Sequence, residues 1–122
     1  MVMKYFIVGV GGMLGGITRY ALGKWISERC TGIIPIGTLL INISGAFLLG
    51  IVSSMYLSKE NLYLLLAEGY LGAYTTFSTF MYEGYNLYRE DERKSAVIYI
   101  LGTLLLGMIG FITGGLLVYL LK

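Results

Sequence analysis

A run of hydroxyl and aromatic side chains lies inside a stretch of sequence that is otherwise apolar enough to cross a membrane. Residues 72–80 read Gly-Ala-Tyr-Thr-Thr-Phe-Ser-Thr-Phe. Lipid offers no hydrogen-bond partners, so polar groups at this depth must be satisfied by protein, water or an ion. We therefore expect this segment to face an ion pathway or a binding site.

The order of residues within the run suggests two kinds of ligand. Phe77 and Phe80 are three residues apart and are predicted to share a helix face, while Ser78 and Thr79 point elsewhere around the same turn. The edge of a phenyl ring is electropositive and can contact an anion, although ordinary aromatic packing is the alternative. Glycine and hydroxyl residues, beginning at Gly72, are also compatible with a helix break whose freed carbonyls hold a cation.

Other polar residues interrupt the remaining apolar stretches, and each has two interpretations. Arg19 could attract anions to a pore mouth, or it could extend to the nearby membrane surface. Asn42 could donate to an anion without titrating, or it could make an interhelical hydrogen bond. Glu83 is expected to reach a vestibule near the end of its span, where an acid could relay protons or simply be exposed at the membrane interface. Thr103 could belong to a polar track, or it could bond to a carbonyl of its own helix.

The composition is that of a membrane protein. Of 122 residues, 57% are hydrophobic and only 13% are charged, whereas a soluble domain carries about 25% charged residues. The chain has no histidine, the commonest general base, and no nucleophile–base arrangement, so we do not expect an enzyme. A net charge of +2 gives no indication of a nucleic-acid partner. The 18 glycines suit helices that approach one another closely.

The length predicts an all-α fold with four membrane spans of about 20 residues in one domain, residues 1–122. The third span is longer than a membrane requires. The expected spans are residues 3–25, 33–57, 61–88 and 95–121. Aromatic residues near the span ends are expected at the membrane–water interface: Tyr5, Trp25, Tyr56, Tyr63, Tyr88, Tyr99 and Tyr119.

The basic residues outside the spans give a weak orientation signal. One side of the membrane would carry Lys4, Lys59 and Lys122, and the other would carry Lys24, Arg29, Arg89, Arg93 and Lys94. So small a difference permits insertion in both orientations and hence an antiparallel dimer, although a fixed topology is the alternative. Four helices enclose only a narrow gap, so a homodimer with two copies of every site is the smallest plausible working unit.

Taken together and in order, these motifs resemble the CrcB/Fluc family of fluoride channels over the whole chain. The matching residues are Gly11-Gly12-x-x-Gly15-Gly16-x-x-Arg19-Tyr20, Gly37-Thr38-Leu39 through Asn42, and Gly69-x-x-Gly72 followed by Thr75 to Phe80. The resemblance implies a passive, fluoride-selective channel that exports fluoride across the cell membrane. It also implies an antiparallel, dual-topology dimer with a broken third helix and two pores.

The resemblance further implies a role for each matching position. The pore would use two ring edges, an amide donor and nearby hydroxyls, a vestibule would carry two charged residues, and backbone carbonyls would hold a structural sodium ion at the dimer centre. The corresponding residues are Phe77, Phe80, Asn42, Ser78, Thr79 and Thr103 for the pore, Arg19 and Glu83 for the vestibule, and Gly72 and Thr75 for sodium.

The sequence departs from the family pattern at two places. Tyr74 stands where many members have a small or aliphatic residue, which concerns the local shape of the break. Thr103 matches the polar track of the fourth span, but the positions one and two turns further on are Gly107 and Phe111. Some relatives also work as pairs of different chains, so a heterodimer is an alternative to the homodimer.

Two other classes of protein compete with a channel. A small multidrug/proton antiporter is also a four-span antiparallel dimer, but its mechanism needs an acid within the membrane. The first span has no Asp or Glu between Met1 and Ser27. A non-transporting assembly subunit would use its glycines and hydroxyls only for packing, and it would tolerate replacement of Asn42 and of both phenylalanines.

Overall fold

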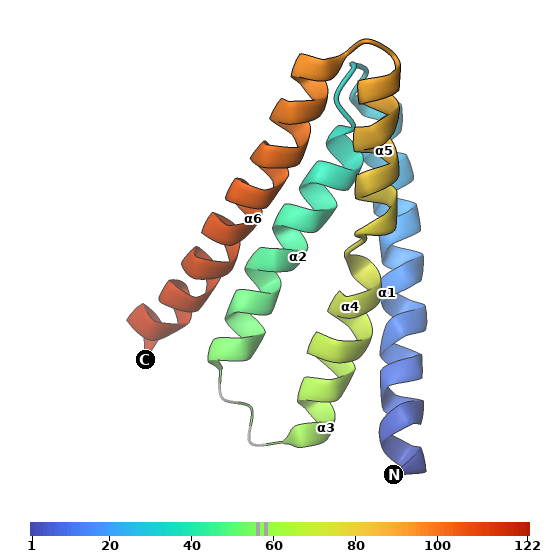
Figure 1. Cartoon of the computed structure of the whole chain (residues 1–122). Helices are drawn as coiled ribbons and strands as arrows, with labels where there is room; N and C mark the ends of the chain where they lie inside the picture. The colour runs from blue at the N-terminus through green and yellow to red at the C-terminus, as the bar shows by residue number, and fades with distance from the viewer. Residues whose placement is uncertain (56, 58) are drawn as a thin grey trace.

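Long helices run up and down past one another in a computed structural model that describes residues 1–55, 57 and 59–122. Tyr56, one of the expected interfacial aromatic residues, lies outside the described residues. Figure 1 shows the order across the bundle as α6, α2, the third span and α1, and no strand occurs in the described part of the chain. The helices are α1 Val2–Arg29, α2 Ile36–Ser54, α3 Glu60–Tyr63, η1 Leu64–Leu71, α4 Gly72–Tyr74, α5 Ser78–Arg89 and α6 Arg93–Leu121.

Three of these helices, α1, α2 and α6, are long and apolar enough to cross a membrane. The third span is divided among α3, η1, α4 and α5, with η1 in the wider π-helical form. The all-α membrane fold and the broken third helix predicted from the sequence are therefore confirmed. The second helix begins at Ile36 rather than at residue 33, because Pro35 stands at its start and proline favours the first turn.

The break in the third span is a short extended segment between α4 and α5. Thr75 has φ −80° and ψ 158°, which is extended backbone, and α5 resumes at Ser78. The extended residue turns the following peptide group away from the helix axis. As a result, the carboxyl end of α4 and the amino end of α5 meet near the middle of the third span.

Helices α1 and η1 cross at a distance that only glycine permits. A Cβ atom added at Gly15 would fall on the carbonyl oxygen of Tyr70, and one added at Gly69 would lie 2.7 Å from the carbonyl oxygen of Val8. Lipid is as apolar as a leucine side chain, so helices in a membrane associate by close packing rather than by the hydrophobic effect. Gly11 and Gly15 of the first sequence motif therefore serve this crossing, whereas nothing lies within 4 Å of a Cβ at Gly16.

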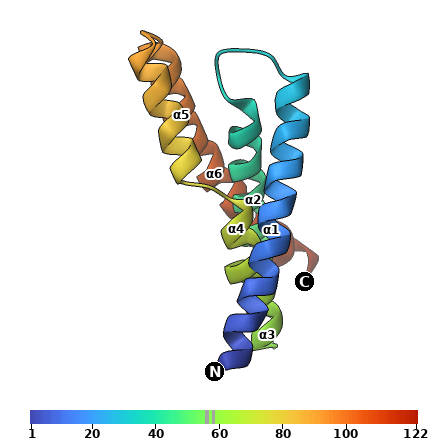
Figure 2. The same ribbon diagram turned by 90° about the vertical axis from the view of Figure 1, so that its right-hand side faces the viewer.

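A second glycine seam joins α2 to α6. A Cβ atom at Gly50 would fall on the carbonyl oxygen of Phe111, and one at Gly114 would fall on that of Phe47. Helix α6 also packs against α5, so it links the second half of the broken span to α2. Figure 2 shows α5 and α6 together leaning away from α1 at the end that carries the turn between them.

The seam between α2 and α6 gives a direct test of this packing. We expect Gly114→Ala to lower the free energy of unfolding by about 1–3 kcal/mol, since the new methyl group overlaps backbone atoms that cannot move aside. Gly102→Ala is the matched control on the same helix, because nothing lies within 4 Å of a Cβ there. Unfolding of the purified protein in mixed micelles measures both variants, and equal stability of the two would contradict the close crossing.

Candidate functional site

Asn42 on α2 holds the break in the third span through both ends of its side-chain amide. Its Nδ2 donates to the Thr76 carbonyl oxygen at 2.9 Å, and its Oδ1 accepts from the Thr76 N–H at 2.9 Å. The side chain thus replaces the helical partners that the extended backbone removes. Of the two interpretations of Asn42, the structure shows the interhelical bond, and an amide nitrogen still has a second hydrogen to donate.

Arg19 on α1 reaches the same break from the other side. Its Nη1 donates to the carbonyl oxygen of Thr75 at 3.3 Å. This is an inward contact, so Arg19 organises the break rather than extending to the membrane surface. The guanidinium and the amide of Asn42 therefore bind consecutive carbonyl groups, those of Thr75 and Thr76.

The two phenylalanine rings contact each other, as their spacing predicts, but they differ greatly in exposure. Their ring centroids are 6.3 Å apart with the planes tilted by 56°, yet Phe77 is 75% exposed and Phe80 only 4% exposed. Phe77 is the N-cap of α5 with helical backbone angles, and its carbonyl accepts from the Met81 N–H at 2.9 Å, so the helical spacing that predicts contact between the two rings holds. Phe80 points inward and packs with tilted planes against Tyr99 at 5.3 Å.

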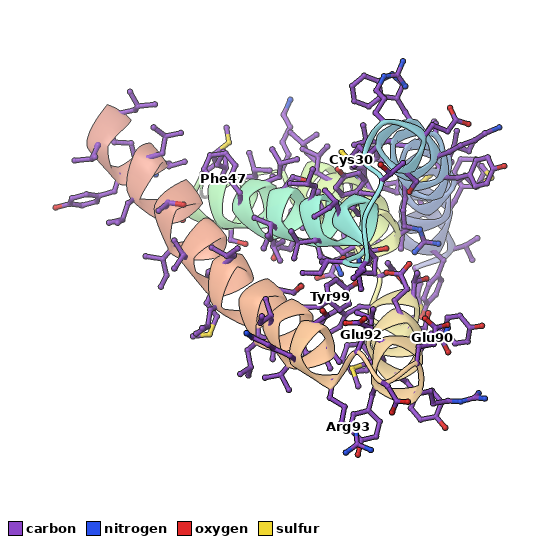
Figure 3. All side chains as sticks on the ribbon, turned by 90° about the horizontal axis from the view of Figure 1, so that it is seen from above. Cys30, Phe47, Glu90, Glu92, Arg93 and Tyr99 are labelled. Atoms are coloured by element: carbon purple, nitrogen blue, oxygen red, sulfur yellow. The ribbon has the colours of Figure 1, made fainter. Side chains whose placement is uncertain are left out.

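Glu83 lies at the centre of a hydrogen-bonded group that joins α2, α5 and α6. Thr38 donates to its Oε1 at 3.0 Å, and the Tyr99 hydroxyl donates to its Oε2 at 3.0 Å. Tyr99 is 0% exposed and does not belong to the interfacial aromatic residues, so that prediction was wrong for this tyrosine. Figure 3 shows Tyr99 between the ribbons of α2, α5 and α6.

Two neighbouring cavities collect most of the predicted site residues. A cavity of about 420 Å³ is lined by the amide, both phenylalanines, the α6 threonine and the two residues that the family resemblance predicts for sodium: Asn42, Phe77, Phe80, Thr103, Gly72 and Thr75. A second cavity of about 280 Å³ is lined by Arg19, Thr79 and Glu83. Thr76 lines both cavities, so the break separates them.

The hydroxyl groups differ in what they can still donate. Thr103 donates to the Tyr99 carbonyl oxygen of its own helix at 2.7 Å, as one of its two interpretations predicted. Thr76 instead accepts from the Thr79 N–H at 3.3 Å, which leaves its hydroxyl hydrogen for another acceptor. Ser78 is exposed and is not among the residues lining either cavity.

Sequence reasoning missed Thr76 and the inward direction of Tyr99. Thr76 belongs to the Thr-Thr-Phe run, but its type alone does not reveal that its backbone receives Asn42. Tyr99 lies near the start of α6, where a tyrosine is ordinarily interfacial. Its distance of sixteen residues from Glu83 carries no signal, because the pairing depends on the turn between α5 and α6.

Comparison with known proteins gives the same family for nearly the whole chain. The family model described as "CrcB-like protein, Camphor Resistance (CrcB)" matches residues 6–115. The chain belongs to the CrcB family. It is 52% identical over 112 residues to a protein of Clostridium acetobutylicum named "Fluoride-specific ion channel FluC 2", covering 92% of this chain and 95% of that one. A protein of the same name from Moorella thermoacetica is 42% identical over 119 residues, covering 93% and 98%.

A third CrcB relative supports the same assignment. "Fluoride-specific ion channel FluC" of Acidobacterium capsulatum is 40% identical over 111 residues, which cover 88% of this chain and 89% of that one. These matches extend across every helix that positions the site. Together with the apolar helices, they identify a multi-pass membrane protein.

The contact between Asn42 and Thr76 can be tested by substitution. We expect Asn42→Ala to destabilise the protein by about 1–3 kcal/mol for each of the two Thr76 groups left unpaired. Amide hydrogen exchange at Thr76 should accelerate more than overall unfolding does. Mass spectrometry of deuterium uptake over residues 72–80 measures this.

Asn61→Ala is the matched control, because Asn61 is an exposed residue of α3 at the opposite end of the same half-span. Equal exchange in the two variants would show that Asn42 does not hold the break.

Proposed function

We propose that this chain is a passive, fluoride-selective channel that exports fluoride and works as an antiparallel homodimer with two pores. The observation that carries the proposal is the 420 Å³ cavity, in which the Asn42 amide and the rings of Phe77 and Phe80 meet beside the break. The names of relatives up to 52% identical support fluoride as the ion.

The break supplies an electrostatic reason for an anion to approach. The unpaired N–H groups at the amino end of a helix carry partial positive charge and favour anions. Helix α5 begins at Ser78, directly beside Phe77 and the cavity. A small anion that loses its water there could take up the remaining Asn42 hydrogen, the Thr76 hydroxyl and the ring edges.

The lining of this cavity favours passive conduction over proton-coupled exchange. Its residues are uncharged throughout the part of the chain that the structure describes. Arg19 and Glu83 border the neighbouring cavity instead. Fixed charge outside the narrow path raises the local ion concentration without trapping the ion, whereas a proton-coupled antiporter needs a titrating acid in the path itself.

A second copy of the chain would close the pathway. Phe77 is largely exposed in one protomer although it borders a cavity lined by Asn42 and Thr76. Polar groups at this depth are unfavourable against lipid, so another protein surface is expected to cover them. The antiparallel homodimer satisfies this requirement, and a heterodimer with a related chain is the alternative.

The carbonyl groups at the end of α4 support the proposed sodium site. The N–H of Thr76 would bond the Gly72 carbonyl in an uninterrupted helix, but it bonds Asn42 instead. The Gly72 carbonyl is thereby released, and the extended Thr75 turns its own carbonyl toward Arg19. Two such pairs, one from each protomer, form an all-oxygen set suited to a hard cation. A sodium ion bound there would tie the protomers together, and it would share the Thr75 oxygen with Arg19.

Fluoride efflux from liposomes tests the function. We expect the purified protein to release fluoride rapidly and chloride slowly, and we expect Phe80→Ile or Asn42→Ala to lower fluoride flux about tenfold, which corresponds to a barrier raised by about 1.4 kcal/mol. A fluoride electrode and a chloride electrode record the two fluxes in parallel.

Phe6→Ile is the matched control for this experiment, because Phe6 is an exposed ring on α1 that borders neither site cavity. Cross-linking confirms that each variant remains a dimer. Unaltered flux in both site variants would reject the pore assignment and favour the assembly role. Absence of flux from the intact homodimer would point to a missing partner chain.

Sodium removal tests the cation site separately. Replacing sodium by N-methylglucamine at constant ionic strength should lower the thermal stability of the dimer, because the released carbonyls lose their shared ligand. The ratio of fluoride to chloride flux should change little, since the carbonyls do not select the anion. A melting temperature independent of sodium would remove the cation site from the proposal and leave the channel function intact.

A further inference from the structure

Tyr74 is a buried tyrosine at the last residue before the break, and its hydroxyl group has no role in the site described above. It is 4% exposed. Its hydroxyl oxygen lies 2.9 Å from Ser44 Oγ on α2. Tyr74 lies close in sequence to the two residues whose carbonyl groups border the break, Gly72 and Thr75. The position of Tyr74 therefore affects the direction of these carbonyl groups.

The direction of this hydrogen bond follows from the second contact of Ser44. Ser44 Oγ donates its only hydrogen to the carbonyl oxygen of Ile41 at 3.0 Å. Ser44 can therefore only accept from Tyr74, and the Tyr74 hydroxyl is the donor. The result is an ordered chain of hydrogen bonds from Tyr74 through Ser44 to the backbone of α2.

The ring of Tyr74 is held by packing as well as by its hydroxyl. On α2, a Cβ atom at Gly45 would lie 3.3 Å and 3.5 Å from two carbons of the ring, so the missing side chain provides the space that the ring occupies. Tyr70 stacks on the ring at 6.1 Å with the planes 8° apart. Packing therefore leaves the ring little room to shift, and the hydrogen bond of its hydroxyl group fixes its final position.

Helix α2 thus fixes the break at two points that flank Thr75. Ser44 holds the residue before it, Tyr74, and Asn42 holds the residue after it, Thr76. The carbonyl of Thr75 lies between the two attachments. Its direction relative to the preceding helical turn depends on both of them, because a peptide group is rigid and only the flanking dihedral angles can move it.

We propose that the Tyr74 hydroxyl is a positioning group that aims the carbonyls of Gly72 and Thr75 and thereby sets the affinity of the break for its monovalent cation. The inference rests on the sodium site of the proposed function. A hard cation binds well only where its oxygen ligands are already in place, so a small rotation of α4 weakens binding while the helices remain packed. The ring of Tyr74 alone would fill the space, so packing does not explain why a hydroxyl group is buried here. The alignment of the Gly72 and Thr75 carbonyls does explain it.

The test measures the sodium concentration that gives half of the maximal thermal stabilisation of the intact dimer, titrated against N-methylglucamine at constant ionic strength. We expect Tyr74→Phe and Ser44→Ala to raise this concentration at least about threefold, the effect of one lost hydrogen bond. Ser44→Thr retains a hydroxyl on α2 and should restore the original value. Tyr70→Phe is the matched control, because it removes a hydroxyl from the same aromatic stack and leaves the bond to Ser44 in place.

The outcomes separate this inference from the function on which it rests. A raised sodium requirement in Tyr74→Phe and Ser44→Ala, but not in Ser44→Thr or Tyr70→Phe, supports it. A lower melting temperature at saturating sodium, with an unchanged half-maximal concentration, overturns it and makes the bond merely structural. If the original chain conducts fluoride with no sodium dependence of stability, both the cation site and this inference fail while the channel function stands.

Discussion

One residue, Thr76, dominates the arrangement of the whole site through its backbone N–H and carbonyl groups. At the depth of the break neither its N–H nor its carbonyl can find water in lipid, so leaving it unpaired would favour a continuous helix instead. Asn42 satisfies both groups at once. That contact makes the break stable, and the break in turn places the carboxyl end of α4 against the amino end of α5.

The glycine seams make this contact possible at a distance. A side chain as short as asparagine reaches a neighbouring backbone only when the helices lie unusually close. At Gly45, one turn from Asn42, an added Cβ would fall on the Thr75 side chain. Gly15 and Gly69 allow an equally close approach between α1 and the third span. This approach brings Arg19 within reach of the Thr75 carbonyl. The same glycine residues therefore produce both the close packing of the helices and the polar contacts of the site.

The sequence was sufficient to predict features that depend on the depth of a residue in the membrane. It was not sufficient to predict those that depend on which way a side chain points. Hydrophobicity located the spans, and the glycines and hydroxyls after Gly72 located the break. Spacing along a helix predicted that the rings of Phe77 and Phe80 lie together, but it did not reveal that one is exposed and the other buried. The position of Tyr99 near a helix end suggested the membrane surface, because sequence gives the height of a residue but not whether it faces the neighbouring helix. For Asn42 the residue type allowed both roles, and only the structure reveals that the interhelical bond to the Thr76 backbone is made.

The hydrogens already engaged limit how the cavity can treat an ion. In the cavity lined by both phenylalanines, Thr103 donates to its own helix and one hydrogen of Asn42 goes to Thr76. Few strong donors remain, and the cavity is otherwise lined by apolar groups and ring carbons. If this cavity is the proposed pathway, a large anion would gain little from such sparse donors, whereas a small one would approach the remaining Asn42 hydrogen, the Thr76 hydroxyl and two ring edges at once. An ion held by so few groups can also leave, because conduction requires binding that compensates for lost water without exceeding it. The hydrogen bonds that build the break would thus also limit how tightly the proposed pathway binds an anion.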